Sequence, residues 1–159
     1  MDERVNLKLL GTNQEDLKVI SAYLQDSIVV VNDLVFLKQN KTFIMIVNRF
    51  MWEDFEKGIF REVKRIRCAV KFEEVLEVKS YNINQKNKKR SLEYLAIKCS
   101  SNIDETYNIK IFFAGDSVIT LLFEAIEVFM RDLGKPWYVK YVPLHKIWML
   151  KYVMILNKT

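Results

Sequence analysis

Short runs of β-branched and aromatic residues, separated by polar turn signals, follow one another from residue 28 to residue 123. Such runs are typical of β-strands, because branched and aromatic side chains fit a pleated surface. Strands that follow one another through short turns pair antiparallel, since parallel neighbours need a long crossover connection. The runs are IVVV, LVFL, TFIMIVNRF, RCAVKFEEVLEVKSYNI, LEYLAIKC, YNIKIFF and SVITLLF. This pattern predicts an antiparallel β-meander or barrel of about seven strands.

Turn-forming residues predict two of the connections between strands. For two other segments, two secondary structures remain possible. Asn32 and Asp33 stand between IVVV and LVFL, which predicts a two-residue hairpin turn. Residues 114–116, Ala-Gly-Asp, predict a tight turn between the last two strands. The segment at residues 67–83 fits either one long bent strand or two short strands, and residues 53–66 fit a loop or a short helix.

A helix is predicted before the strands. Asn13 can cap its first turn, and Asp16 follows three residues later, near the positive end of the helix. Leu17, Ile20 and Leu24 then recur at a spacing that forms one apolar stripe. The stripe predicts an amphipathic helix whose apolar face packs on the sheet.

A second helix is predicted after the strands. Apolar residues return to helical spacing at Ile126, Phe129, Met130 and Leu133. Gly134 stands where a C-terminal cap belongs, and Pro136 blocks continuation. The predicted class is therefore α+β, with the meander between an N-terminal and a C-terminal helix. A helix over the open end of a bent meander is pleckstrin-homology-like, an analogy of fold that implies no function.

The composition fits one globular domain with an apolar tail. Half of the 159 residues are hydrophobic, and glycine and proline are scarce, which excludes low-complexity linkers. We assign residues 1–145 to a single domain and residues 146–159 to the tail. The predicted core consists of Ile28, Val30, Val35, Phe43, Met45, Ile97, Ile111, Phe113, Ile119, Ile126 and Phe129.

No known catalytic arrangement is recognisable in the sequence. The single histidine, His145, comes at the start of the tail, and the four glycines are too far apart for a phosphate-binding loop. Cys68 and Cys99 lie in separate strand-like segments, without the close spacing of metal ligands. We therefore expect no enzyme, no metal and no cofactor. The acidic N-terminus and the lack of a long apolar run predict a cytoplasmic protein.

Basic residues concentrate in two places, in a chain of net charge +5. The first cluster is Arg61, Lys64, Arg65, Arg67 and Lys71, and the second is Lys86, Lys88, Lys89 and Arg90. Neither has the interleaved aromatic residues of a single-strand binder, and acids alternate with bases along most of the chain. We interpret both clusters as solvated surface and keep nucleic-acid association as the alternative function. That alternative requires the two clusters to meet on one face free of acids.

The stretch NRFMWEDF places an arginine and a tryptophan among apolar residues. If TFIMIVNRF is a strand, Arg49 leaves an apolar face at the strand end, where a charge can pair without full desolvation. Acids that could pair with it are Asp26, Asp33, Glu53 and Asp54. Trp52 could stack on the guanidinium. Two interpretations stay open for Arg49, Trp52, Glu53 and Asp26: a structural clamp, or a small pocket for an anion or a peptide.

The tail combines Trp148, Tyr152 and aliphatic residues with Lys146 and Lys151. Aromatic rings and lysines together suit a membrane interface. An apolar segment of this kind can also pack on its own domain or on a second copy. We favour self-packing or dimerisation over peripheral membrane contact.

Several segments together resemble an uncharacterised family found in alphaproteobacteria, domain-of-unknown-function family 2948. They are EDLKVISAYLQDSIV, NRFMWE, FEEVLEVKS, LEYLAIK, FAGDSVITL and EAIEVFMRDLG, and they cover most of residues 15–134 in order. The resemblance implies relatives and no activity. The chain departs from the family pattern after His145. The function predicted from the sequence is a non-enzymatic binding or adaptor module for a protein partner, with a second copy as one such partner.

Overall fold

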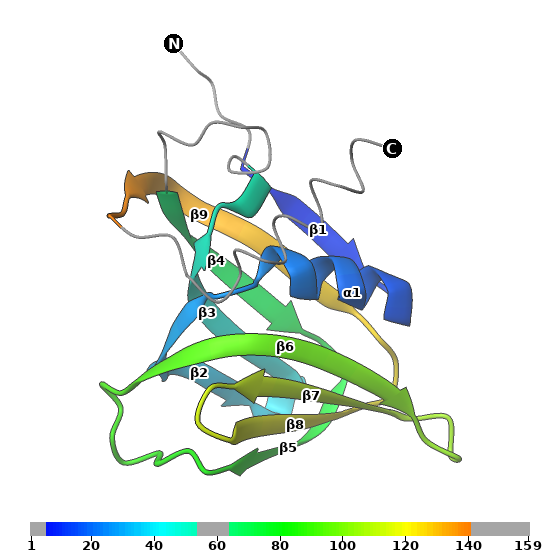
Figure 1. Ribbon diagram of the computed structural model, residues 1–159. Helices are drawn as coiled ribbons and strands as arrows, with labels where there is room; N and C mark the ends of the chain where they lie inside the picture. The colour runs from blue at the N-terminus through cyan, green and yellow to red at the C-terminus, as the bar shows by residue number, and fades with distance from the viewer. Residues whose placement is uncertain (1–5, 54–63, 141–159) are drawn as a thin grey trace.

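The computed structural model describes residues 6–53 and 64–140, and this part of the chain forms one curved nine-stranded sheet with one α-helix against it (Figure 1). The elements are β1 (Lys8–Gly11), α1 (Gln14–Tyr23), β2 (Ile28–Leu37), the short 3-10 helix η1 (Lys38–Asn40), β3 (Thr42–Phe50), β4 (Lys64–Phe72), β5 (Val75–Tyr81), β6 (Ser91–Ser101), β7 (Tyr107–Phe113), β8 (Ser117–Phe123) and β9 (Val128–Tyr138).

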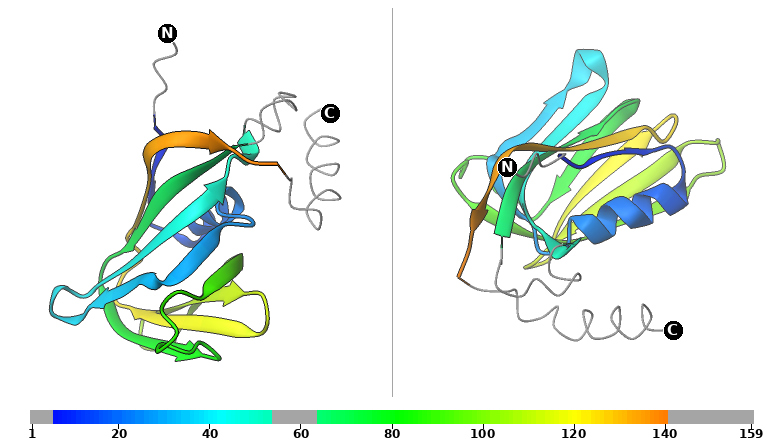
Figure 2. Two further views of the ribbon diagram at one scale, coloured as in Figure 1. Left: turned by 90° about the vertical axis from the view of Figure 1, so that its left-hand side faces the viewer. Right: turned by 90° about the horizontal axis from the view of Figure 1, so that it is seen from above.

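Neighbouring strands in this sheet pair antiparallel, in the order β1-β9-β4-β3-β2-β6-β7-β8-β5. The sheet bends so that β9 and β4 lie on one side of the molecule while β7, β8 and β5 lie opposite (Figures 1 and 2). The predicted antiparallel sheet is confirmed. The sheet has nine strands rather than seven, and it stays open, with β1 and β5 as its edges.

The N-terminal helix forms as the sequence predicts. The side chain of Asn13 accepts a hydrogen bond from the backbone N–H of Asp16 at 2.8 Å. Leu17, Ile20 and Leu24 are buried in the core. A polar contact fixes the helix to β6. The hydroxyls of Ser21 and Tyr94 lie 2.7 Å apart, and the backbone N–H of Ile97 donates to the Ser21 hydroxyl at 3.1 Å.

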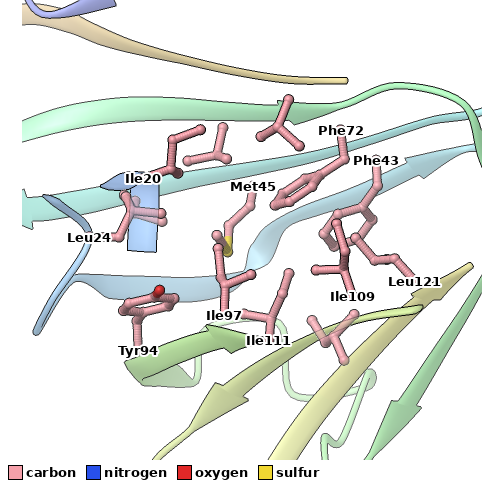
Figure 3. Close-up of a cluster of buried hydrophobic side chains, with 14 of the residues drawn as sticks. Ile20, Leu24, Phe43, Met45, Phe72, Tyr94, Ile97, Ile109, Ile111 and Leu121 are labelled. Carbon is pink, nitrogen blue, oxygen red and sulfur yellow. The ribbon is translucent and has the colours of Figure 1, made fainter. Parts of the chain in front are cut away.

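The core lies inside the bend of the sheet, where side chains from α1 and from both halves of the sheet meet (Figure 3). Seven of the residues predicted for the core are buried: Phe43, Met45, Ile97, Ile111, Phe113, Ile119 and Ile126. The prediction for β2 chose the wrong face, because Val29 and Val31 are buried while Ile28 and Val35 are exposed and Val30 is half-buried. Where successive residues of a strand are all apolar, as in the run IVVV, the sequence does not show which face of the strand is inward.

The predicted C-terminal helix is wrong, because its residues form the end of the connection after β8 and the strand β9. β9 pairs with both β1 and β4. Val128, Met130 and Asp132 point inward, and Phe129 points outward with 38% of its surface exposed. Gly134 has φ of +70° at an irregularity of the β4–β9 pairing rather than at a helix cap. The analogy with the pleckstrin-homology-like superfold stays a prediction.

One connection also differs from the prediction. Asn32 and Asp33 lie inside β2, at a bulge where the pairing with β3 shifts between Val29 and Leu34. The hairpin turn comes later, at η1, and ends at Lys41 in the left-handed conformation. Of the alternatives for residues 67–83, the two-strand one is confirmed, since β4 and β5 meet at a sharp turn. Residues 54–63 lie outside the described part.

Candidate binding site

Arg49 is the largest fully buried side chain of the described part, and its guanidinium is held by two carboxylates. Its Nε and Nη2 donate to the two carboxylate oxygens of Asp132 at 2.7 Å each. Its Nη1 and Nη2 donate to the two oxygens of Glu53 at 2.9 and 2.7 Å. Four of the five guanidinium N–H groups are therefore committed to charge-assisted hydrogen bonds.

The partners of Arg49 come from different parts of the chain. Glu53 lies four residues away and was predicted, whereas Asp132 lies across β4 on β9 and was missed. Asp132 was missed because residues 126–133 were expected to form a helix. In a strand, the inward series of Val128, Met130 and Asp132 ends with an acid on an apolar face, and that pattern could have found it.

The aromatic ring against Arg49 is Tyr23 of α1, whose centroid lies 5.8 Å from the guanidinium carbon. Trp52 packs instead against Phe50, with ring centroids 4.3 Å apart, and its indole N–H donates to the backbone oxygen of Gln25 at 2.7 Å. The expected stacking of Trp52 on Arg49 is therefore corrected. Trp52 is buried and links the end of β3 to the segment after α1.

Asp26 is buried near this cluster, whereas Arg49 is held by Asp132 and Glu53. Its backbone oxygen accepts a hydrogen bond from Arg65 at 2.9 Å, and Arg65 also donates to the backbone oxygen of Asn48 at 3.0 Å. Burial lowers the pKa of Arg65, and the charge of Asp26 opposes that shift. Asp26 thus belongs to the link between α1, β3 and β4.

The charge on Arg49 is fixed by its surroundings. Burial alone would lower the pKa of its guanidinium, but the hydrogen bonds to Asp132 and Glu53 outweigh that effect and raise it. With no exposed surface and two carboxylate partners, the side chain has neither access nor free charge for an incoming anion. The geometry therefore favours the clamp over the pocket among the two interpretations of NRFMWEDF.

A hollow of about 430 Å³ lies outside this clamp, beside α1. It is lined by Glu15, Lys18, Val19, Ala22, Tyr23, Trp52 and Glu53. Its charged groups and the Trp52 N–H are already engaged, since Lys18 pairs with Glu15 at 3.0 Å, Glu53 holds Arg49, and the Trp52 N–H is bonded. The hollow therefore offers little to recognise a ligand.

A second cavity, of about 400 Å³, lies where the sheet fails to close between β2 and β5. We call it the β2–β5 cavity, and its lining is Val31, Asn32, Leu34, Val35, Phe36, Phe43, Val78, Ser80, Ile83, Gln85, Lys88 and Ile119. Most of these side chains are apolar, and its volume falls within the range of small-molecule sites. Of these residues only Lys88 was among the candidate site residues predicted from the sequence, because an opening between two strands has no local sequence signal.

The bulge of β2 helps to shape this cavity. It turns the backbone N–H groups of Val31 and Asn32 toward the connection between β5 and β6, where they donate to the oxygens of Arg90 and Lys88 at 2.9 Å each. Beyond the bulge, Leu34 to Leu37 pair with β3 alone within the described residues. β5 likewise pairs only with β8 there. Two strand edges thus border the cavity.

The two basic clusters do not form one acid-free face. In the first cluster, Arg65 donates hydrogen bonds to two backbone oxygens, and the Lys64 ammonium lies 4.9 Å from the ring centroid of Tyr138. Arg67 of the same cluster pairs with Asp33 at 3.5 Å. Asp33 follows Asn32, which bonds the backbone of Lys88 in the second cluster. An acid therefore stands where the clusters approach each other, which does not favour a nucleic-acid surface.

Several sequence-based predictions, including Asp54 as a partner of Arg49, fall outside the described residues. Arg61 of the first basic cluster, His145, and the tail at residues 146–159 all belong to segments that the structure does not describe. In residues 6–53 and 64–140, no group of three or more His, Cys, Asp or Glu side chains could hold a metal ion. No helix in the same part is long and apolar enough to cross a membrane.

The two cysteines are expected to differ in reactivity. Burial raises the pKa of the Cys68 thiol to about 12, and the nearby Asp132 charge adds to the shift. Burial raises the pKa of Cys99 as well, but this residue is half-buried on β6. We expect iodoacetamide to modify Cys99 in the folded protein and Cys68 only after denaturation, because the thiolate is the nucleophile. Peptide mapping by mass spectrometry measures this, and equal modification of both in the folded state would contradict the buried position of Cys68.

The model of the family described as "Protein of unknown function (DUF2948)" matches residues 7–145. The chain belongs to the DUF2948 family. The match confirms the resemblance drawn from the sequence, and it covers every described element of this DUF2948 protein from β1 to β9. Comparison with curated proteins and with solved structures gives no match. The family description names no activity. The β2–β5 cavity is the feature of the described residues that bears most directly on function.

Proposed function

We propose that this DUF2948 protein is a non-enzymatic binding module that encloses an apolar group in the β2–β5 cavity. The observation that supports this most directly is the lining, which is apolar apart from four polar side chains. Burial of apolar surface drives the entry of such a group, at about 25 cal/mol for each Å² removed from water.

The composition of the lining also favours binding over reaction. Lys88 is the only titratable side chain among the described residues that line the cavity. A nucleophile is usually activated by an adjacent base, and the lining offers no carboxylate, histidine or cysteine that could serve as one beside Lys88. The hydroxyl of Ser80 has no such base beside it, since it accepts a hydrogen bond from the Gln85 amide at 3.1 Å.

A protein partner, as predicted from the sequence, is the competing occupant. β5 is an edge strand, and an extended peptide can add to such an edge through main-chain hydrogen bonds. The apolar cavity beside this edge favours a compact apolar group over a long added strand. Peripheral membrane contact and self-association through residues 146–159 stay predictions.

A neutral fluorescent probe tests the proposal. N-phenylnaphthylamine carries no charge and emits strongly only in apolar surroundings, so we expect saturable binding to the folded protein. The variant Val78→Trp fills the cavity from β5, and we expect it to weaken probe binding by about tenfold or more, equivalent to roughly 1.4 kcal/mol.

Val118→Trp is the matched control. Val118 lies on the neighbouring strand β8, next to the cavity residue Ile119, and is not part of the lining. The control should bind the probe like the unmodified protein, and thermal melting should show that both variants fold. No saturable binding by the unmodified protein, or equal binding by both variants, would overturn the proposal.

A further inference from the structure

The polar groups of the β2–β5 cavity gather at one end. Asn32 lies in the bulge of β2, Ser80 near the end of β5, and Gln85 and Lys88 in the following loop. The Gln85 amide donates to the Ser80 hydroxyl, and the Asn32 backbone N–H donates to the oxygen of Lys88. Toward the tip of the β2–β3 hairpin the lining is apolar. The cavity therefore has a polar end and an apolar end.

The polar end is also the positively charged end. We call residues 82–90 the basic loop, since they contain Lys86, Lys88, Lys89 and Arg90 and no acid. None of these four side chains forms an ion pair within the described residues. The acid Asp33, which lies beside Asn32, is paired with Arg67. An uncompensated positive potential at a cavity mouth attracts anions.

The basic loop is held in position at both ends. At one end the backbone oxygen of Asn82 accepts a hydrogen bond from the Ser117 hydroxyl at 2.8 Å, and its side chain donates to the oxygen of Gly115 at 2.8 Å. At the other end the oxygens of Lys88 and Arg90 bond to β2. Because these contacts fix the loop before any ligand arrives, its charges need little further ordering to act on one.

We propose that the occupant of this cavity is a single-chain amphiphile with an anionic head, of which a fatty-acid carboxylate is the simplest case. Its chain lies toward Phe36 and Phe43, and its head lies at Lys88. The side-chain amides of Asn32 and Gln85 can donate to carboxylate oxygens beside Lys88. A single carboxylate suits this end better than a phosphate, because the lining offers one lysine and no arginine fork. This inference rests on the proposed function.

Three ten-carbon probes separate the head from the chain. Decanoate, decanol and decyltrimethylammonium carry the same chain with a negative, a neutral and a positive head. Each is titrated against bound N-phenylnaphthylamine, below its micelle concentration and at low ionic strength. We expect all three to displace the probe, with decanoate about five- to tenfold tighter than decyltrimethylammonium. The difference should shrink as salt is added.

Reversing the charge of Lys88 tests whether this residue causes the preference for decanoate. In Lys88→Glu we expect the preference for decanoate over decyltrimethylammonium to be lost or reversed, while decanol still displaces the probe. Lys110→Glu is the matched control, because Lys110 is an exposed lysine on β7 outside the cavity lining, and it should keep the preference. Equal affinity for decanoate and decyltrimethylammonium would overturn this inference while leaving the proposed function standing. Failure of decanol and decanoate alike to displace the bound probe would overturn this inference, whereas absence of probe binding would overturn both, and an extended peptide added to β5 would then be the better account.

Discussion

Replacing Arg49 with alanine is expected to lower the free energy of unfolding by about 3–5 kcal/mol. The variant leaves the carboxylate of Asp132 buried without its two hydrogen bonds, and it also releases Glu53. Removing one partner of a buried pair costs more than the pair itself contributes, because the remaining charge is desolvated and uncompensated. Urea denaturation followed by tryptophan fluorescence measures the loss.

Lys88→Ala and Arg49→Lys are the controls. Lys88 is exposed and forms no ion pair within the described residues, so its removal should change stability by no more than about 0.5 kcal/mol. Arg49→Lys keeps the charge but loses the planar fork that meets Asp132 and Glu53, so an intermediate loss is expected. Small, equal effects of Arg49→Ala and Lys88→Ala would contradict the clamp and favour a ligand role for Arg49.

Replacing Phe72 with alanine is the second large change, with an expected loss of about 3–5 kcal/mol. Phe72 is fully buried on β4, and its ring lies 5.9 Å from Phe43 and 6.1 Å from Phe123, measured between centroids. The substitution removes apolar contacts from both halves of the sheet at once and leaves a cavity between them. The free energy of unfolding in urea measures the effect.

Phe129→Ala is the matched control for this change. Phe129 lies beside Lys71, one register position from Phe72, but on β9 it points outward and is 38% exposed. We expect it to cost well under half of the Phe72→Ala loss, because less of its surface is removed from water on folding. Equal losses for both variants would contradict the inward face assigned to β9.

Local sequence patterns predicted the elements that depend on local chemistry. The Asn13 cap, the stripe of α1 and the antiparallel pairing of successive runs all follow from side chains within a few residues of one another. The strand β9 was missed because its apolar residues fit the spacing of a helix as well as the alternation of a strand. Pairing with β1 and β4 makes this segment a strand, and that pairing is not visible in the local sequence. For β2, four successive branched residues left the buried face undefined.

The site could be predicted only in part for the same reason. The pairing of Arg49 with Glu53 is local and was anticipated, whereas Asp132 reaches Arg49 only through the pairing of β9 with β4 and of β4 with β3. The basic loop was visible in the sequence as a run of like charge. The position of the basic loop at the polar end of a cavity was not visible in the sequence, because this position depends on the bulge of β2 and on the bend of the sheet.

Paramagnetic broadening in NMR spectra tests the central claim, that the β2–β5 cavity is the binding site. The probe is a fatty acid that carries a nitroxide on its chain, added to the isotopically labelled protein. We expect the amide signals of Val78, Ile83 and Ile119 to broaden first, because these residues line the cavity. The signals of Val19 and Ala22, at the hollow beside α1, should stay sharp. Broadening that begins at α1, or that spreads evenly over the protein, would contradict the claim.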